Sequence, residues 1–201
     1  NETAPPEAAP RRLSPSRLGG DESAAVSPAQ GESRNQAQRG KILHRMLQYL
    51  PDFPAAERTQ AAERFLALHW SDIAPEQRAT YTEEIMRIIG HPDHAALFGP
   101  DSRAEAGIAG KIGGIDMSGQ IDRLVIDAHQ IMIVDYKTNR PPPESIAAIP
   151  ASYRRQMAAY RALLQQIEPG KEVRCFLLWT YTGVMMELPE SDLGHLDLAA
   201  A

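Results

Sequence analysis

The sequence predicts a domain that combines α-helices and β-strands, and three observations lead to this prediction. Hydrophobic residues first recur at the spacing of helices. Apolar runs typical of strands follow, divided by glycine-containing or polar breaks. One strong helix then separates these strands from a final strand pair. The predicted order is therefore helices, strands, one helix and a hairpin.

Residues 1–38 differ in composition from the rest of the chain. They are rich in Pro, Ala, Ser and Gly and contain few large apolar side chains. Such a segment cannot bury enough surface to offset its conformational entropy. We therefore predict a flexible linker over 1–38 and one domain over 39–201. The chain begins with Asn rather than Met, and we expect it to be a piece of a longer protein.

Three helices are predicted ahead of the strands. Leucine and methionine recur at helical spacing between Gly40 and Leu50, and Pro51 ends the run. Two further helices are predicted over 54–70 and 75–89, because each segment has Pro near its start and Glu in its opening turns.

The strand-like segments come next. Glycine or polar residues divide three of them, and a loop rich in Pro then leads to the strong helix. The final two strands flank Thr and Gly, which indicates a hairpin. The predicted strands cover 103–114, 119–126, 130–137, 173–181 and 184–188, and the helix covers 152–166.

The central hairpin can be given a register. If 127–130 is a four-residue loop, Ile126 pairs with Ile131. Stepping back along both strands then makes Asp122 face Asp135, and Gln120 face Lys137. The hairpin is therefore predicted to be apolar near its turn and charged at its open end.

Asp135 and Lys137 share one face of a strand, because alternate residues of a strand point the same way. Opposed carboxylates at Asp122 and Asp135 would repel each other and require positive charge. Lys137 supplies one charge, and clustered oxygen ligands also suit a divalent cation such as magnesium. The alternative is an ordinary ion pair of Asp135 with Lys137 at a strand end, with Asp122 as a solvated edge residue.

Composition excludes few functions. The net charge of −5 argues against a generally cationic nucleic-acid coat, although it permits a local basic groove. The single Cys175 excludes an internal disulfide framework and a cysteine-ligated metal site made by this chain alone. No apolar run is long enough for a bilayer and no signal-peptide pattern occurs at the start, so we expect a soluble, cytoplasmic protein.

Four spaced motifs resemble a known family. They are "GKILHRML", "SGQIDRLV", "IVDYKTNR" and "YRRQMAAY". Together they are similar to the nuclease domain of the AddA/RecB helicase-nucleases, within the PD-(D/E)XK (restriction-endonuclease-like) superfamily, and most similar to the carboxy-terminal domain of bacterial AddA. The likeness covers about residues 40–190. The superfamily name describes Pro before the first acid, where this chain has Ile121.

The resemblance implies a fold and a site. The fold would be an α/β, restriction-endonuclease-like core with a mixed central sheet flanked by helices and extra N-terminal helices. Asp122 and Asp135 would bind magnesium, with manganese as a second possibility, together with the backbone carbonyl of Tyr136. His44 would be a further metal ligand, although a lone helix histidine is more often a boundary residue. Lys137 would position the attacking water and offset charge in the transition state.

Gln156 and Tyr160 complete the predicted catalytic set. They lie one helical turn apart and share a face, so both could approach one phosphate. The alternative for them is a half-buried polar pair that supports the sheet. Glu105 could be an accessory acid, but a solvated edge residue is the stronger expectation. The other histidines, His69, His91, His94 and His129, match no motif and are expected at the surface or in loops.

The predicted function is a magnesium-dependent deoxyribonuclease domain, of exonuclease type, in a helicase-nuclease that acts in double-strand-break repair. Its partners would be DNA strands from unwound duplex, helicase domains of the same polypeptide and an AddB-type subunit. The sequence contains no G-x-x-x-x-G-K-[ST] phosphate loop, so a motor would lie outside this segment. The alternatives are a catalytically silent domain that binds DNA or a partner, and a stand-alone PD-(D/E)XK nuclease.

Overall fold

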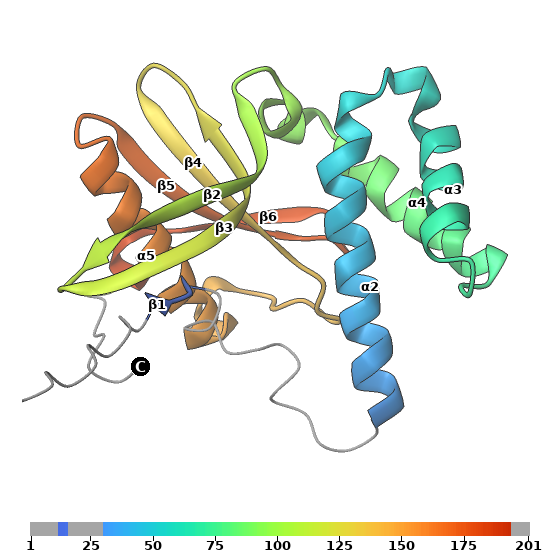
Figure 1. Cartoon of the computed structure of the whole chain (residues 1–201), viewed down its shortest axis with the longest axis horizontal. Helices are drawn as coiled ribbons and strands as arrows, with labels where there is room; N and C mark the ends of the chain where they lie inside the picture. The colour runs from blue at the N-terminus through green and yellow to red at the C-terminus, as the bar shows by residue number, and fades with distance from the viewer. Residues whose placement is uncertain (1–11, 16–29, 194–201) are drawn as a thin grey trace, which may run out of the picture.

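The computed structural model describes residues 12–15 and 30–193, and one six-stranded sheet lies at its centre (Figure 1). The strands follow the order β1-β3-β4-β5-β6, and β2 pairs with β3. Their bounds are β1 Arg12–Leu13, β2 Ser102–Ile112, β3 Ile115–Ile126, β4 Gln130–Lys137, β5 Glu172–Trp179 and β6 Val184–Leu188.

The strand directions make this a mixed sheet. β2, β3 and β4 are antiparallel neighbours, and β5 and β6 form an antiparallel hairpin. β4 and β5 run parallel, because the chain crosses over between them through helix α5, Ala151–Ile167. β1 pairs in parallel with the first residues of β3. The α/β fold class with a mixed sheet is confirmed.

Helices cover both faces of the sheet. α5 packs on one face, and α2, α3 and α4 lie on the other (Figure 1). Among the helices in the described ranges, none is long and apolar enough to cross a membrane. The remaining bounds are α2 Gln30–Tyr49, η1 Leu50–Asp52, η2 Ala55–Glu57, α3 Arg58–His69, α4 Pro75–Ile89, η3 Pro92–Phe98, η4 Ile146–Ala148 and α6 Glu190–Leu193.

Alternation along β4 divides the hydrophobic core into two layers. Ile131 and Ile133 point toward α5, whereas Val134 and Tyr136 point toward α2 and α4. All four side chains are almost fully buried, and burial of each aliphatic one stabilises the fold by about 1.5–3 kcal/mol. β4 therefore carries both layers and can hold its charged end, Asp135 and Lys137, in a fixed place.

The predicted register of the central hairpin is confirmed near its turn. Ile126 pairs with Ile131, and pairing continues back to Arg123 with Val134. α4, β4 and β6 also have the predicted bounds. The backbone amides that close the turn bond to the carboxylate of Asp127, which accepts from the amides of two following residues at 2.8 Å.

The first long helix begins earlier than predicted. α2 starts at Gln30 rather than near Gly40, so residues 30–38 of the predicted linker are helical. This stretch has no apolar stripe, so its hydrophobic pattern could not reveal it, although most of its residues are good helix formers. Of the remaining linker, 1–11 and 16–29 lie outside the described residues. The domain boundary at residue 38 stays a prediction.

His94 is buried, and its predicted surface position is wrong. Only 2% of the residue is exposed, and its Nδ1 lies 3.0 Å from the carbonyl oxygen of Ile88. Burial lowers the pKa of His94. The short helix η3 folds this side chain back onto the end of α4, a tertiary contact that the local sequence did not indicate.

Candidate active site

The charged end of the central hairpin is a fork between two strands. β3 and β4 pair as far as Arg123 and Val134, and then separate. β4 continues beside β5, where Lys137 pairs with Trp179. At the fork the carboxylate of Asp122 replaces the missing strand partner, because its Oδ2 accepts a hydrogen bond of 2.7 Å from the amide of Tyr136.

Separation of the strands overturns one predicted pair. Gln120 does not face Lys137 but pairs with Gly107 of β2, and its carbonyl accepts a hydrogen bond from the hydroxyl of Tyr160. Asp122 and Asp135 also lie beyond the last pair of this ladder, Arg123 with Val134, so the pairing does not extend to the predicted opposition of these two acids. The ladder ends early because the side chain of Asp122, and not the backbone of β3, accepts the hydrogen bond from the Tyr136 amide. β5 pairs with the other edge of β4 along its whole length.

On the α5 side of the fork, Asp135, Lys137 and Gln156 form a closed triangle. Lys137 Nζ lies 2.9 Å from Asp135 Oδ2, and the side chains of both residues are 7% exposed. The amide of Gln156 joins them: its Nε2 donates to Asp135 Oδ1 at 2.9 Å, and its Oε1 accepts from Lys137 at 3.3 Å. The ring of Tyr153 covers the ammonium, with Nζ 3.8 Å from the ring centroid. The pair on alternate residues of β4 is therefore a buried, fully oriented ion pair.

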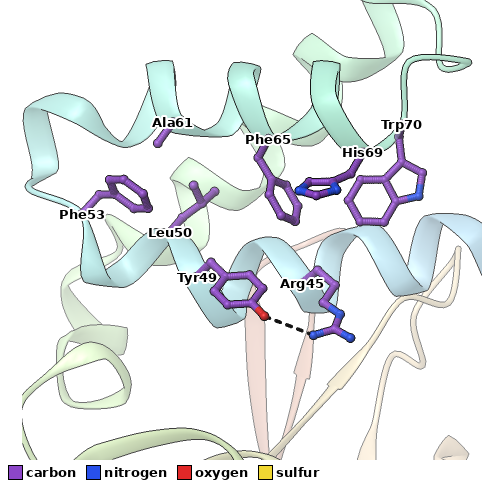
Figure 2. A pocket seen from close by; sticks show the side chains of 8 residues that line it. All are labelled: Arg45, Tyr49, Leu50, Phe53, Ala61, Phe65, His69 and Trp70. Carbon is purple, nitrogen blue, oxygen red and sulfur yellow. Dashed lines mark hydrogen bonds between the residues drawn. The ribbon is translucent and has the colours of Figure 1, made fainter.

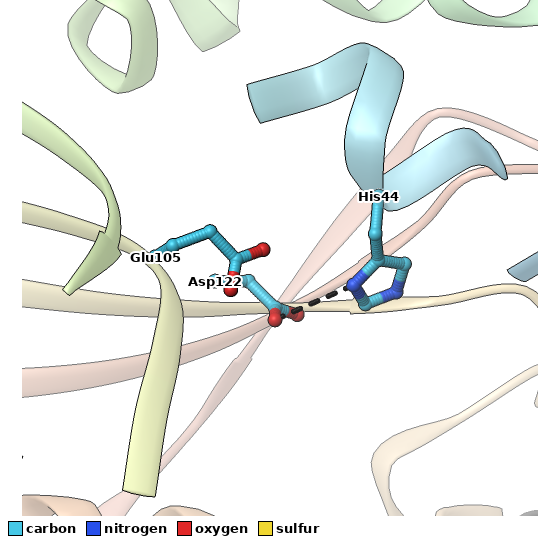
Figure 3. A group of neighbouring side chains, drawn as sticks. All are labelled: His44, Glu105 and Asp122. Carbon is cyan, nitrogen blue, oxygen red and sulfur yellow. Dashed lines mark ion pairs between the residues drawn. The ribbon is translucent and has the colours of Figure 1, made fainter. Parts of the chain in front are cut away.

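On the α2 side of the fork, His44, Glu105 and Asp122 form a second cluster (Figure 3). One potential ligand atom from each residue lies within 4.8 Å of the other two. His44 Nδ1 is 3.4 Å from Asp122 Oδ1, and its Nε2 is 3.1 Å from the carbonyl oxygen of Tyr136. This side is more open, since 29% of the His44 side chain is exposed.

Glu105 was expected as a solvated edge residue, but it is half-buried and belongs to this cluster. It lies on β2 between Ala104 and Ala106, which pair with the two neighbours of Asp122. Its φ of 51° is in the left-handed region, which non-glycine residues rarely adopt. Burial, followed by Asp122, raises the pKa of Glu105, while the positive charges of His44 and Arg45 oppose the rise.

The sequence contains a turn that fixes which residue of β3 lies opposite Glu105. Gly113 and Gly114 both have positive φ and form a two-residue turn, so Ile112 pairs with Ile115. Counting back from that turn places Glu105 opposite Asp122. The glycine pair therefore contained the information that brings the third acid to the site.

Asp122 and Asp135 each lie beside a positive charge at the fork. Burial lowers the pKa of His44, but the carboxylate of Asp122 outweighs it and raises that pKa to about 9. Burial disfavours the charge on Asp122 too, yet His44 and the Tyr136 amide hold the pKa of Asp122 below its usual value. Burial raises the pKa of Asp135 to about 6, although Lys137 opposes this. Asp122 and Asp135 are therefore each paired with a positively charged side chain.

The donor atoms at the fork fit a hard divalent cation. Carboxylates of Asp122 and Glu105, the Tyr136 carbonyl and the His44 imidazole are gathered on the open side. Carboxylate and carbonyl oxygens are ligands that magnesium prefers, and imidazole suits several transition metals. Asp135 Oδ2 is buried and, among the described residues, accepts no aligned hydrogen bond besides its ion-pair contact with Lys137. It retains capacity for a cation.

Of the predicted metal ligands, His44, Asp122 and the Tyr136 carbonyl lie together, whereas both oxygens of Asp135 face Lys137 and Gln156. Tyr160 shares a helical face with Gln156, as predicted, but it is fully buried beneath β3. A side chain at Gly119 would lie only 3.2 Å from its ring, so glycine permits this close approach.

A buried ion-pair network holds the segment that follows Lys137. Glu84 of α4 is 4% exposed and binds Arg39 and Arg140, each at 2.6 Å. Arg39 also donates to the carbonyl of Thr138 at 2.8 Å. Sequence reasoning did not select Glu84, although it lies within the apolar face of α4 beside Tyr81, Ile85 and Ile88.

Comparison with known proteins gives a family match. Residues 17–188 match the family model of the PD-(D/E)XK nuclease superfamily. This range contains every residue of the fork described above.

Comparison with solved structures gives a fold match. A provisionally assigned exonuclease from Eubacterium rectale has a TM-score of 0.55 at 12% sequence identity, over 92% of this chain and 75% of that one. The structure of SSO0001 has a TM-score of 0.35 at 12% identity, over 80% of this chain and 82% of that one, which is too low to support an argument. At these identities the first likeness concerns the fold alone. No curated protein matches the chain.

Proposed function

The chain belongs to the PD-(D/E)XK nuclease superfamily, and from this premise we propose that it is a metal-dependent deoxyribonuclease whose active site is the fork between β3 and β4. The observation that carries the proposal is the meeting of Asp122, Asp135 and Lys137 at one strand end, with His44 and Glu105 beside them. The helices on either side fix these groups in two clusters. The open cluster on the α2 side is His44, Glu105 and Asp122, and the buried triangle on the α5 side is Asp135, Lys137 and Gln156.

The open cluster would hold the cation. His44, Glu105, Asp122 and the Tyr136 carbonyl supply an imidazole nitrogen and several oxygens, a set that magnesium or manganese accepts. A divalent cation bound there would polarise the scissile phosphate and lower the pKa of a water. The hydrogen bond from the Tyr136 amide fixes one oxygen of Asp122, so the other oxygen remains directed toward His44.

The buried triangle would act on the phosphate. Lys137 is held by Asp135 and Gln156, so its ammonium is oriented before substrate arrives. A fixed cation at this place would position the attacking water and stabilise the charge that develops on the phosphate. Asp135 would also join the metal ligands, and Gln156 would orient both partners. Tyr160 would act as a positioning residue, because its hydroxyl binds the Gln120 carbonyl two residues before Asp122.

The cellular role follows from the motifs. We propose that the domain acts as an exonuclease within an AddA-type helicase-nuclease in double-strand-break repair. Its substrate would be single strands delivered by helicase domains of the same polypeptide, and an AddB-type subunit would be its partner. The support is the spacing of the four motifs, which resembles that family, and the presence of their key residues at one fork.

Incubation with end-labelled DNA tests the function. Single-stranded and duplex substrates are incubated with magnesium, with manganese and with chelator. An exonuclease releases short labelled products or shortens strands progressively from an end, and it does so only with divalent cation. Absence of cleavage of all substrates at every metal concentration would contradict the proposal and favour a catalytically silent domain.

A further inference from the structure

A groove outside the fork has the chemistry of a nucleobase site. It lies between α2 and α3, has a volume of about 660 Å³ and falls in the range of small-molecule pockets. We call it the aromatic groove. Figure 2 shows rings along its length, with Phe53 at one end and Trp70 at the other. Its lining is Arg45, Tyr49, Leu50, Phe53, Ala61, Phe65, His69 and Trp70.

Four rings of this groove, those of Tyr49, Phe65, His69 and Trp70, form a chain of ring contacts. Phe65 lies at its centre, with ring centroids 5.0 Å from His69, 5.2 Å from Trp70 and 6.0 Å from Tyr49. Tyr49 and Phe53 nevertheless remain 44% and 42% exposed. Large aromatic side chains that stay half exposed around one hollow mark a binding surface rather than a core.

The charge of the groove differs from that of the whole chain. The chain has a net charge of −5, yet no acid is among the lining residues that the structure describes, and Arg45 is a permanent cation. Arg45 is exposed, and its Nη1 lies 3.3 Å from the hydroxyl of Tyr49 (Figure 2). The groove therefore offers aromatic faces beside a positive charge.

The groove and the fork share helix α2 as a wall. Arg45 follows His44 directly in that helix, so one residue contacts Asp122 while its neighbour lines the groove. The positive charge of Arg45 also opposes the rise in the pKa of Glu105, a residue of the open cluster. A chain that extends from the fork along α2 would therefore pass the guanidinium and then meet the rings.

We infer that the aromatic groove binds unpaired bases of the DNA strand whose backbone lies at the fork. Every base has a π-face, so stacking on protein rings does not require a particular sequence, and a guanidinium can hold a phosphate or stack as well. Bases inside a duplex are already stacked and cannot enter. This inference rests on the proposed nuclease function and adds the surface that would hold the bases of the single-stranded substrate.

The test is a binding measurement in chelator, where no cleavage occurs. The probes are a labelled oligothymidylate of about 12 nucleotides and an abasic oligomer of equal length, which keeps the phosphates and lacks the bases. Tyr49→Ala and Phe53→Ala are each expected to weaken oligothymidylate binding about tenfold. Phe53→Leu, which keeps an apolar side chain and removes only the ring, is expected to lose a similar factor.

Leu68→Ala is the matched control. Leu68 lies on α3, is 77% exposed and does not line the groove, so its variant should bind like wild type. The abasic oligomer should bind to wild type at least about tenfold more weakly than oligothymidylate does. The groove substitutions should not weaken the binding of the abasic oligomer further. Melting temperatures verify that each variant is folded.

Two results would overturn the inference: unchanged oligothymidylate affinity in folded groove variants, or equal affinity of wild type for the abasic oligomer. Cleavage in magnesium, measured separately, distinguishes the two proposals. If wild type cleaves DNA and the groove variants bind oligothymidylate normally, the base-binding role of the groove is refuted and the nuclease proposal stands. If wild type never cleaves but base binding depends on the groove, the nuclease proposal fails and the groove assignment stands.

Discussion

Asp122 contacts an amide with one carboxylate oxygen and directs the other toward an imidazole. The first contact completes the sheet where β3 and β4 separate, and the second belongs to the open cluster with Glu105. One side chain therefore has both a structural and a ligand role. Because the amide of Tyr136 fixes the carboxylate plane, the second oxygen does not need to be ordered when a ligand binds.

Metal affinity should depend on both clusters. We predict that Glu105→Gln weakens magnesium or manganese binding about 10–100-fold, since it removes one charged oxygen from the open cluster. Asp135→Ala should also weaken binding, because the proposal makes that acid a ligand. Calorimetric titration of wild type and each variant measures the effect.

Asp116→Asn provides the control for this titration. Asp116 lies on β3 but pairs with Lys111 at 2.7 Å, away from the fork, so its loss should leave metal affinity unchanged. Unaltered affinity in Asp135→Ala would remove that acid from the ligand set. Unaltered affinity in Glu105→Gln would show that the open cluster does not form the site.

Lys137→Ala should abolish cleavage while metal and DNA still bind. The carboxylates can hold the cation without the ammonium, whereas loss of a preorganised charge at the phosphate costs about 10²–10³-fold in rate. Single-turnover cleavage at saturating magnesium, together with a melting curve, measures both aspects of the change.

The alternative for Lys137 is a purely structural counter-ion. Its removal leaves Asp135 buried without its partner, which would lower stability by up to about 3–5 kcal/mol. Added magnesium would then restore stability and cleavage together. Near-normal cleavage by a folded Lys137→Ala variant would refute the catalytic role.

Among elements, α4 contributes to the site through Glu84. This acid holds Arg39 of α2 and Arg140 after β4, so three segments meet at one carboxylate. We predict that Glu84→Gln lowers the free energy of unfolding by about 3 kcal/mol, because buried Arg39 would lose its charged partner. Urea denaturation measures this change.

Glu83→Gln is the matched control, because Glu83 is the exposed neighbour in the same helix. Its variant should stay within about 0.5 kcal/mol of wild type. An equally small effect for Glu84→Gln would show that the network does not hold the end of β4.

The elements themselves were well predicted where local pattern is strong. α4, β4 and β6 have the predicted bounds because proline, alternation and turn residues mark their ends. The fork was not predicted, because β3 leaves β4 beyond Arg123 and Val134 while β4 stays paired with β5 on its other edge. Where this separation occurs depends on contacts between distant segments, and no local pattern in the sequence shows it.

At the scale of the molecule, the site depends on two helices from opposite ends of the domain. α2 supplies His44 to one side of the fork, and α5 supplies Gln156 to the other. The sequence could predict that both approach the strands, because their motifs match a family in which they do. The separation into an open cluster and a buried triangle required the structure, since it follows from side-chain packing on each face.

Deletion of residues 1–38 should leave the fold intact. The shortened chain keeps Arg39 and the buried residues of α2, and it loses β1 and the polar start of that helix. A decrease in melting temperature of at most about 4 °C is expected, equivalent to about 1 kcal/mol. Thermal melting of both forms measures it, and a much larger decrease would show that the fold requires β1 or the start of α2.

The most direct test of the central claim is the single-turnover cleavage rate of Asp122→Asn in magnesium. The amide keeps the shape of the side chain but removes the charge that the open cluster shares. If the fork is the active site, the cleavage rate of Asp122→Asn should be at least about 10³-fold lower than that of wild type. Asp116→Asn should cleave at the wild-type rate, and both variants should be folded. Cleavage by Asp122→Asn within a few-fold of wild type would place the active site elsewhere.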